Sequence, residues 1–326
     1  MRAMVIDRFG GPEVFRDAEV ETPSPRAGEV LIRIAYAGVN PADWKCREGW
    51  LAQFFDTKFP FIVGFDAAGV VAAVGEGVTA YRPGDRVVTS SNQGIGDWGT
   101  YAEYARSDID RVAKLADGLG FKTAASIPTA AVTSWEGLFD TGGLKAGQSL
   151  LINGGAGGMG SFAIQFAKRA GARVAATCGP SNLNYVHDLG ADLVVDYRSQ
   201  NVLETVLAWA PGGVDLIMDT VGQGTLLDGI QMTKPGGLIA PIGTLIQGEP
   251  QFDSAAAQAR NVRIVPTMSN RTRAGDQLRE IVGLYNQGAF VPPHLEILPL
   301  AQAGEAQRRV KDGHVRGKIL LHVADL

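Results

Sequence analysis

The glycine-rich stretch 152–160 could bind the phosphates of a nucleotide, because it holds five glycines between an apolar and an amphipathic segment. Its Gly155-x-Gly157-x-x-Gly160 spacing matches the dinucleotide fingerprint. In that fingerprint the three glycines permit, in order, a tight turn, a close backbone approach to the pyrophosphate, and close helix–strand packing. N–H groups at the start of the following helix, at Gly158 and Met159, would face the phosphates. The alternative, a flexible linker, fits poorly with structured elements on both sides.

The segment that follows the next predicted strand bears on which nucleotide is bound. An NAD site usually has an acidic residue about 20 residues beyond the first glycine, where it binds the ribose hydroxyls. Residues 176–182 contain no Asp or Glu, so nothing there would repel a 2′-phosphate. Ser181 and Asn182, and one strand further on Tyr197 with Arg198, could donate hydrogen bonds to that phosphate. The sequence therefore predicts NADPH, with NADH as the alternative.

The elements that must position this loop form a repeating pattern from Lys145 onward. Short apolar runs alternate with helix-length segments, which is typical of a doubly wound parallel sheet with helices on both faces. A helix is expected at 161–170, directly after the loop. Six strands are expected, the number in a full dinucleotide-binding sheet. They are Ser149–Ile152, Arg173–Thr177, Leu193–Tyr197, Val214–Asp219, Leu238–Ile242 and Val262–Val265.

Ligands of such sheets bind outside the carboxyl ends of the strands. The backbones that follow the fourth and fifth predicted strands are therefore expected to meet the ribose and nicotinamide. These residues are Val221, Gly222, Ile242, Gly243 and Thr244.

The remainder of the chain has a different character. Residues 1–119 hold short β-branched runs separated by turn signals, which predicts a β-barrel or sandwich-like domain without sustained helices before Lys122. After a further helical stretch, residues 295–300 and 318–323 are expected to be strands that return to this first domain, with no crossover helix between them. The expected organisation is therefore a β domain at 1–121, a nucleotide-binding domain at 122–266 and a returning segment at 267–326.

Composition limits the classes of function. The 326 residues are 45% hydrophobic and 20% charged, with a formal net charge of −4. Neither the charge nor any apolar run suggests binding to nucleic acid or insertion into a membrane, and short basic clusters such as 308–311 are expected to be solvated faces. Cys46 and Cys178 cannot form a disulfide framework. With no signal-like apolar segment at the N-terminus, a cytoplasmic protein is expected.

Seven short motifs follow one another along nearly the whole chain. They are AGVNPADW (37–44), GFDAAGVV (64–71), PGDRV (83–87), GTYAEY (99–104), TSW (133–135), the glycine loop with QFAK (165–168), and GKILL (317–321). In order and spacing they resemble the zinc-independent, zeta-crystallin-like quinone oxidoreductases of the medium-chain dehydrogenase/reductase superfamily. The resemblance implies a GroES-like β-barrel domain beside the nucleotide-binding domain, reduction of quinones or α,β-unsaturated carbonyls by NADPH, and a homodimer.

The resemblance also bears on zinc, because alcohol dehydrogenases share this architecture. In their zinc branch a cysteine and a Gly-His-Glu motif supply ligands to the catalytic metal. Here these positions hold Asn40 and the segment Gly64-Phe65-Asp66, and phenylalanine cannot coordinate a metal. A zinc-free protein is therefore expected. One departure concerns the cofactor: many relatives carry a lysine for the 2′-phosphate after the second strand, where this chain has 181-SNLN-184, so selectivity for NADPH could be reduced.

Without a metal, a conjugated enone or a quinone is an easier hydride acceptor than a simple ketone, because charge delocalises onto a distant oxygen. The resemblance places Asn40 beside the nicotinamide, where its amide could donate to the developing oxyanion. Asp43 and Asp66 could orient Lys45 or a water, and Thr133 resembles a family threonine near the cofactor. The alternatives are a turn residue for Asn40 and structural caps for the other three.

Several aromatic side chains could form an apolar wall for the substrate, or else an ordinary core or lid. They are Trp44, Trp50, Phe54, Phe55, Phe59 and, at the former zinc position, Phe65. Two other functions stay open beside quinone or enone reduction. The first is a zinc-free alcohol or carbonyl dehydrogenase or an enoyl-thioester reductase, and the second is an NADPH-binding structural or regulatory protein with little turnover.

Overall fold

The computed structural model describes residues 1–54, 57–93, 97–242, 248–268 and 273–326. The chain divides into two compact units, the first made of Met1–Val132 with Arg271–Leu326 and the second of Thr133–Asn270. The first unit extends past residue 121 because helix α2 (Phe121–Ala125) packs against its strands β3 (Glu29–Gly38) and β5 (Asp66–Val74). Within the described ranges, no helix is both long enough and apolar enough to cross a membrane. The cytoplasmic location stays a prediction.

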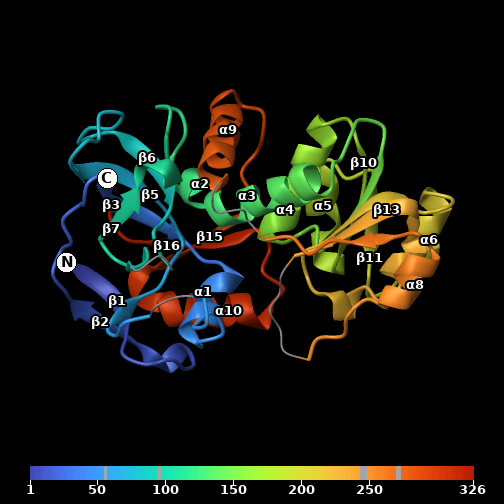
Figure 1. The fold of residues 1–326 in the computed structure, drawn as a ribbon, viewed down its shortest axis with the longest axis horizontal. Helices are drawn as coiled ribbons and strands as arrows, with labels where there is room; N and C mark the ends of the chain where they lie inside the picture. The colour runs from blue at the N-terminus through green and yellow to red at the C-terminus, as the bar shows by residue number, and fades with distance from the viewer. Residues whose placement is uncertain (55–56, 94–96, 243–247, 269–272) are drawn as a thin grey trace. The chain divides into compact units, whose positions relative to one another are not determined.

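The second unit is built on a parallel six-stranded sheet with the order β11-β10-β9-β12-β13-β14. Strands β10, β11 and β13 of this sheet are labelled in Figure 1. The chain starts in the middle at β9, proceeds to β11 at one edge and then runs from β12 to the other edge. This order is that of a doubly wound dinucleotide-binding sheet, which confirms the predicted fold. All six predicted strands are present, as β9 (Ser149–Asn153), β10 (Arg173–Cys178), β11 (Leu193–Asp196), β12 (Val214–Asp219), β13 (Thr233–Pro241) and β14 (Arg263–Ile264).

Helices of the second unit connect these strands. Helix α4 begins at Gly158, three residues before its predicted start, because the glycine loop itself provides its first turn. Leu151, Ile217 and Ile239 are neighbours on one face of the central strands and are fully buried. Their counterparts on the other face, Leu150, Leu216 and Leu238, are buried too, as expected for a sheet covered on both faces. The helices are α3 (Pro128–Trp135, which begins in the first unit), α4 (Gly158–Arg169), α5 (Leu183–Asp188), α6 (Val202–Trp209), α7 (Gly229–Met232) and α8 (Ser254–Ala259).

The first unit is rich in strands, as predicted. A seven-stranded sheet has the order β15-β16-β3-β5-β6-β8, with β7 also paired to β3, and a three-stranded sheet has the order β2-β1-β4. The long strand β3 pairs with β5, β7 and β16, so it is the centre of the larger sheet. The strands not yet given are β1 (Arg2–Ile6), β2 (Phe15–Glu19), β4 (Phe61–Ile62), β6 (Arg86–Ser90), β7 (Tyr104–Asp108), β8 (Val112–Lys114), β15 (Leu295–Pro299) and β16 (Lys318–His322).

The C-terminal segment corrects one expectation. Strand β16 pairs antiparallel with β3 in the first unit, and β15 pairs parallel with β16. Helix α10 (Ala303–Asp312) lies between these two parallel neighbours, so the prediction of no crossover helix was wrong. Parallel strands require such a crossover. The sequence signal was weak, because the apolar residues that α10 buries are only the two alanines Ala303 and Ala306.

Two further helices belong to the first unit. Helix α9 (Ala274–Asn286) accounts for the helical stretch expected after Thr267. Helix α1 (Pro41–Arg47) is a short helix in a region where no sustained helix was expected. It starts with Pro41 at its first position, where the missing N–H of proline costs nothing.

Candidate active site

The glycine loop of the second unit depends on close backbone contacts. Gly154 has a φ of 87°, so the tight turn that the sequence assigned to Gly155 lies one residue earlier. A Cβ on Gly155 would lie 2.8 Å from the Cβ of Ala176, and one on Gly160 would collide with the backbone oxygen of Gly154. Around Gly157, by contrast, the nearest atom to an added Cβ is the Gly154 oxygen at 3.6 Å. Gly155 and Gly160 are therefore required by packing, whereas Gly157 leaves space that a ligand could fill.

The N-terminus of α4 fits a pyrophosphate. Gly157 is its N-cap and makes no side-chain capping hydrogen bond. The first N–H groups of an α-helix, here those of Gly158, Met159 and Gly160, have no acceptor within the helix and carry the positive end of its dipole. A nicotinamide dinucleotide would therefore be held here by backbone groups, as the sequence predicts.

Polar side chains organise the carboxyl ends of the strands where the sheet order reverses. Asn153 at the end of β9 donates to Asp219 Oδ1 and to Thr225 Oγ1, each at 2.9 Å. It accepts from Thr177 Oγ1 of β10 at 2.7 Å, and Thr177 in turn accepts from the Gly154 N–H at 3.0 Å. The loop is thus fixed to three neighbouring strands. The sequence interpretation missed these residues, although each is a polar residue near the end of an apolar strand.

Asp219 fixes three of the predicted cofactor residues. Its Oδ1 accepts from the N–H groups of Val221 and Gly222, each at 3.1 Å, and its backbone oxygen accepts from Ile242 N–H at 2.9 Å. Burial raises the pKa of the Asp219 carboxyl. The backbones after β12 and β13 are therefore held together where a ligand is expected. The other two residues predicted there, Gly243 and Thr244, lie outside the described residues.

The residues predicted to meet a 2′-phosphate lie at neighbouring strand ends. Ser181 and Asn182 form a 3-10 turn after β10, and the Tyr197 N–H after β11 donates to the Cys178 oxygen at 3.3 Å. Tyr197 is 45% exposed, and the Arg198 guanidinium lies 5.9 Å from its ring centroid. The structure thus brings one cation and several hydrogen-bond donors to the same edge of the sheet.

In the first unit, Asn40 is the centre of a buried polar cluster. The residue is 2% exposed, and its side chain bridges two charged groups. The amide Nδ2 donates to Asp66 Oδ2 at 2.9 Å, and Lys318 Nζ donates to the amide Oδ1 at 2.5 Å. Lys318 Nζ also lies 3.6 Å from Asp66 Oδ2. Asn40 is the N-cap of α1. It is more than a turn residue, because its side-chain amide bridges the ion pair of Lys318 and Asp66.

Asp43 is the second carboxylate of this cluster and is fully buried. It accepts from the Asn40 N–H at 2.6 Å, from the Tyr101 hydroxyl at 3.0 Å and from the Phe65 N–H at 3.2 Å. Burial raises the pKa of Asp43 to about 7, and the nearby Asp66 charge adds to this although the hydrogen bonds oppose it. Burial and Asp43 together raise the pKa of Tyr101, which therefore keeps the proton that it donates.

The pKa of Asp43 predicts a pH-dependent stability. Between about pH 4 and pH 7 the folded protein keeps this proton and the unfolded chain has lost it, so stability should fall as the pH rises through that window. Each unit of pKa shift corresponds to about 1.4 kcal/mol. We expect the free energy of unfolding, measured by urea titration at several pH values, to fall across this pH window in the wild type and not in D43N. Equal slopes in the two proteins would show that Asp43 titrates normally.

Asp66 is held by groups from three directions. Its Oδ1 accepts from the Thr129 N–H at 3.0 Å and from Thr129 Oγ1 at 2.6 Å, while Oδ2 faces Asn40 and Lys318. Thr100 Oγ1 donates to its backbone oxygen at 3.0 Å. Lys318 lies beside these carboxylates, and the sequence analysis included it in the GKILL motif without giving it a role in the site.

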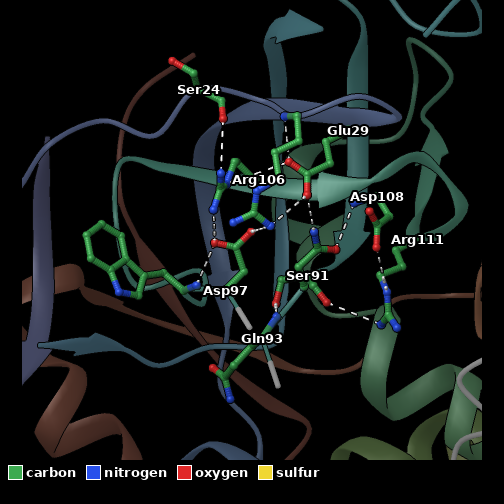
Figure 2. A network of polar contacts seen from close by, with 11 residues as sticks. Ser24, Glu29, Ser91, Gln93, Asp97, Arg106, Asp108 and Arg111 are labelled. Carbon is green, nitrogen blue, oxygen red and sulfur yellow. Dashed lines mark hydrogen bonds and ion pairs between the residues drawn. The ribbon is translucent and has the colours of Figure 1, made fainter. Parts of the chain in front are cut away.

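Ser91 and Gln93 hold the backbone just before Asp66, and both belong to a larger polar network (Figure 2). Gly64 accepts from Ser91 Oγ at 3.0 Å, and its N–H donates to Gln93 Oε1. Beyond these residues, Arg106 contacts Asp97 at 2.6 Å and lies 3.9 Å from Glu29, while Asn92 donates to Glu29 at 3.3 Å. The backbone next to Phe65, the position that carries histidine in the zinc branch, is therefore held by side-chain hydrogen bonds.

The other predicted residues have mixed surroundings. Trp44 is 7% exposed and packs edge-to-face on Trp50, with ring centroids 5.0 Å apart, so little of its ring is available to a substrate. Phe54 is 60% exposed, and Phe65 is partly exposed. Thr133 is buried in α3, where the next residue, Ser134, donates from Oγ to the Met159 oxygen at 3.0 Å. Their roles stay predictions, and Phe55 lies outside the described residues.

The residues at the former zinc positions do not fit a tetrahedral zinc site. Phe65 offers no donor atom, and the oxygen of Asn40 is already bound by the Lys318 ammonium. Among the described residues, no three His, Cys, Asp or Glu side chains are grouped so that they could hold a metal ion. The zinc-free enzyme stays a prediction.

Two protein families match parts of the chain. Residues 26–117 match the alcohol dehydrogenase GroES-like domain, which confirms the expected GroES-like domain, and residues 158–284 match the zinc-binding dehydrogenases. The human quinone oxidoreductase is 29% identical over 98% of this chain and 97% of its own length. The 2-methylene-furan-3-one reductase of Solanum lycopersicum is 35% identical over 99% of this chain and 79% of its own length.

Two solved structures superpose on nearly the whole chain. An NAD-dependent alcohol dehydrogenase superposes with a TM-score of 0.90 at 31% identity, over 99% of this chain and 100% of that one. The mycobacterial protein Rv1454c, solved in complex with NADPH, superposes with a TM-score of 0.88 at 30% identity and the same coverage.

Proposed function

Since the chain belongs to the quinone oxidoreductase group of the medium-chain dehydrogenase/reductase superfamily, we propose that it transfers hydride from NADPH to a quinone or an α,β-unsaturated carbonyl without a metal ion. The chain is an oxidoreductase of a family that uses nicotinamide cofactors. The acceptor, the preference for NADPH and the metal-free chemistry form the proposal.

The observation that carries the proposal is the donor chemistry around Asn40. A simple ketone needs a Lewis acid or a strong general acid at its oxygen, and neither phenylalanine at 65 nor the engaged amide of Asn40 supplies a metal ligand. An amide N–H can still stabilise an enolate or hydroquinone oxygen, whose charge is already delocalised. The names of the human and tomato relatives, a quinone oxidoreductase and a furanone reductase, support the same two acceptor classes.

The residues of this chain then have separate tasks. When bound, the cofactor supplies the hydride. The N–H groups of Gly158 and Met159 hold its pyrophosphate, while Asn153 and Asp219 keep the adjoining strand ends in place. Asn40 donates a hydrogen bond to the acceptor oxygen as negative charge develops there, and water protonates the product afterwards.

A panel of acceptors tests the proposal. Oxidation of NADPH should proceed with quinones and enones, should be slow with simple ketones, and should be unchanged after treatment with a chelator. Activity confined to ketones and abolished by chelation would overturn the proposal in favour of a metal-dependent dehydrogenase. NADPH binding without turnover on any acceptor, enoyl thioesters included, would favour a structural or regulatory role.

The cofactor preference rests on Arg198 and its neighbours. We expect NADPH to bind more tightly than NADH, because Arg198 and Tyr197 can meet the 2′-phosphate and no carboxylate follows β10 to oppose it. R198A should lower the affinity for NADPH about tenfold to a hundredfold and leave that for NADH nearly unchanged, since one charge-assisted hydrogen bond is worth about 1.5–3 kcal/mol. Titrations followed by nicotinamide fluorescence measure both. An equal loss for the two cofactors would mean that Arg198 does not read the phosphate.

One solved neighbour favours a second candidate function. The neighbour called an NAD-dependent alcohol dehydrogenase makes oxidation of alcohols with NAD the alternative to test. Turnover of alcohols with NAD at rates above those for enones with NADPH would select it.

The expected homodimer is also part of the proposal. Strand β14 lies at the edge of the six-stranded sheet, and the exposed apolar residues Val265 (37%) and Met268 (66%) follow it. A sheet edge with exposed apolar residues beside it is a usual place for a second copy to pair. Light scattering of the purified protein should give twice the mass of the 34.4 kDa chain. A monomer mass would contradict the dimer.

A further inference from the structure

Lys318 is a buried cation to which the proposed function gives no role. It begins β16, is 4% exposed, and directs its ammonium at the oxygen of Asn40 and at Asp66. Burial lowers the pKa of Lys318, whereas the two neighbouring carboxylates oppose that shift. Removing an ammonium from water is costly, and an apolar replacement is often equally stable or more so. Stability alone is therefore a weak reason for a lysine here.

Asn40 lies between the two charges of this pair. Its carbonyl oxygen accepts from Lys318 at 2.5 Å, and its nitrogen donates to Asp66 at 2.9 Å. An amide nitrogen carries two hydrogens. Within the described part of the chain, Asp66 is the acceptor for one of them, and no second protein acceptor faces this nitrogen.

The ammonium acts on that second hydrogen in two ways. It fixes which end of the amide is oxygen, because the flipped amide would place an NH2 group against a cation. It also draws electron density toward Oδ1, and hydrogen bonds in a chain polarise one another, so the N–H becomes a stronger donor. Asp66 is itself held by Thr129 through its other oxygen, which limits the movement of this carboxylate.

We propose that Lys318 is a positioning residue for the reaction, which holds and polarises the Asn40 amide so that its free N–H donates to the developing oxyanion of the acceptor. This inference rests on the proposed function. In this role Lys318 supplies the positive charge that polarises the Asn40 amide. The zinc branch has a metal ligand at the position of Asn40.

A double-mutant cycle tests the inference. K318M removes the charge at similar side-chain length, N40A removes the donor, and the double variant removes both. If Lys318 acts through Asn40, each change should lower kcat for an enone about tenfold to a hundredfold, with the KM for the enone changed less than about threefold. The double variant should be no slower than N40A, because coupled residues are not additive. K318R, which retains the charge, should recover part of kcat.

Two controls separate this role from a structural one. K234M removes a lysine that pairs with Asp215 at 2.9 Å in the second unit, and its kcat should equal that of the wild type. Binding of NADPH should be the same in the wild type and K318M. If K318M does not fold, K318Q retains a neutral donor to Asn40 and should lower kcat about tenfold.

The outcomes distinguish the inference from the function on which it rests. Losses of kcat that multiply in the double variant, or a folded K318M or K318Q with unchanged kcat, would overturn the role of Lys318 and leave the proposed function standing. A wild-type protein that reduces no quinone or enone would remove both.

Discussion

Replacing Asn40 with alanine is expected to lower kcat for quinone or enone reduction about a hundredfold, the usual cost of removing one donor to a developing oxyanion. The loss should fall on kcat, because the hydrogen bond strengthens only as charge moves onto the acceptor oxygen. Binding of NADPH should stay near that of the wild type, since the glycine loop, the strand ends and Arg198 are unchanged. Steady-state kinetics and a fluorescence titration of the same preparation measure the two quantities.

Loss of the Asn40 amide also leaves Lys318 and Asp66 without their bridge, so a control for stability is needed. N40D keeps an oxygen that can accept from Lys318, but it has no N–H to donate. It should lose kcat as N40A does, even if the two variants differ in melting temperature. An N40D protein that turns over like the wild type would show that the amide donor plays no part in the reaction.

G160A is expected to reduce NADPH affinity at least a hundredfold. The new Cβ would collide with the Gly154 oxygen and would lie 2.7 Å from the Gly155 Cα, all of it backbone that cannot move independently of the loop. Forcing a methyl group into so tight a contact costs about 1–3 kcal/mol or more and displaces the N–H groups that face the pyrophosphate. Isothermal titration with NADPH gives the affinity, and thermal unfolding gives the stability.

Two other glycines act as matched controls for this substitution. Gly283 in α9 has no atom within 4 Å of an added Cβ, so G283A should bind NADPH normally and be slightly more stable. In G157A the nearest atom lies at 3.6 Å, so the protein should fold normally and lose affinity only if the pyrophosphate approaches that face. Normal NADPH binding by G160A would mean that the loop is not the phosphate site.

The sheet of the second unit was readable from the sequence because its strands are continuous apolar runs. Consecutive residues of these strands, such as Leu150 and Leu151 or Leu216 and Ile217, are buried on alternate faces, and such runs between helix-length segments have few other interpretations. Helix α10 was not readable, since it buries little apolar surface. The tight turn at Gly154 was assigned to its neighbour, because the fingerprint fixes spacing and not backbone angles.

The candidate sites were predictable only in part. The residue types at positions 40 and 65 indicated that the zinc ligands are missing. The partners of Asn40 could not be predicted in this way, because they lie far away in the chain, with Lys318 separated from it by 278 residues. The bond between Asn153 and Asp219 spans 66 residues. Such contacts depend on strand pairing and register, which local patterns do not determine. Trp44 is the opposite case. Its aromatic side chain suggested a wall of the substrate site, but the structure buries this residue almost completely.

The central claim, hydride transfer from NADPH to the conjugated carbon of an acceptor, can be followed directly with an isotope. The protein would be supplied with NADPH deuterated at the transferable position of C4, together with an enone, and the product would be analysed by mass spectrometry and NMR. We expect one deuterium on the β-carbon of a saturated ketone, both with and without chelator. Two results would contradict the account. One is an alcohol product with deuterium on the former carbonyl carbon, and the other is a product that forms without chelator but not with it.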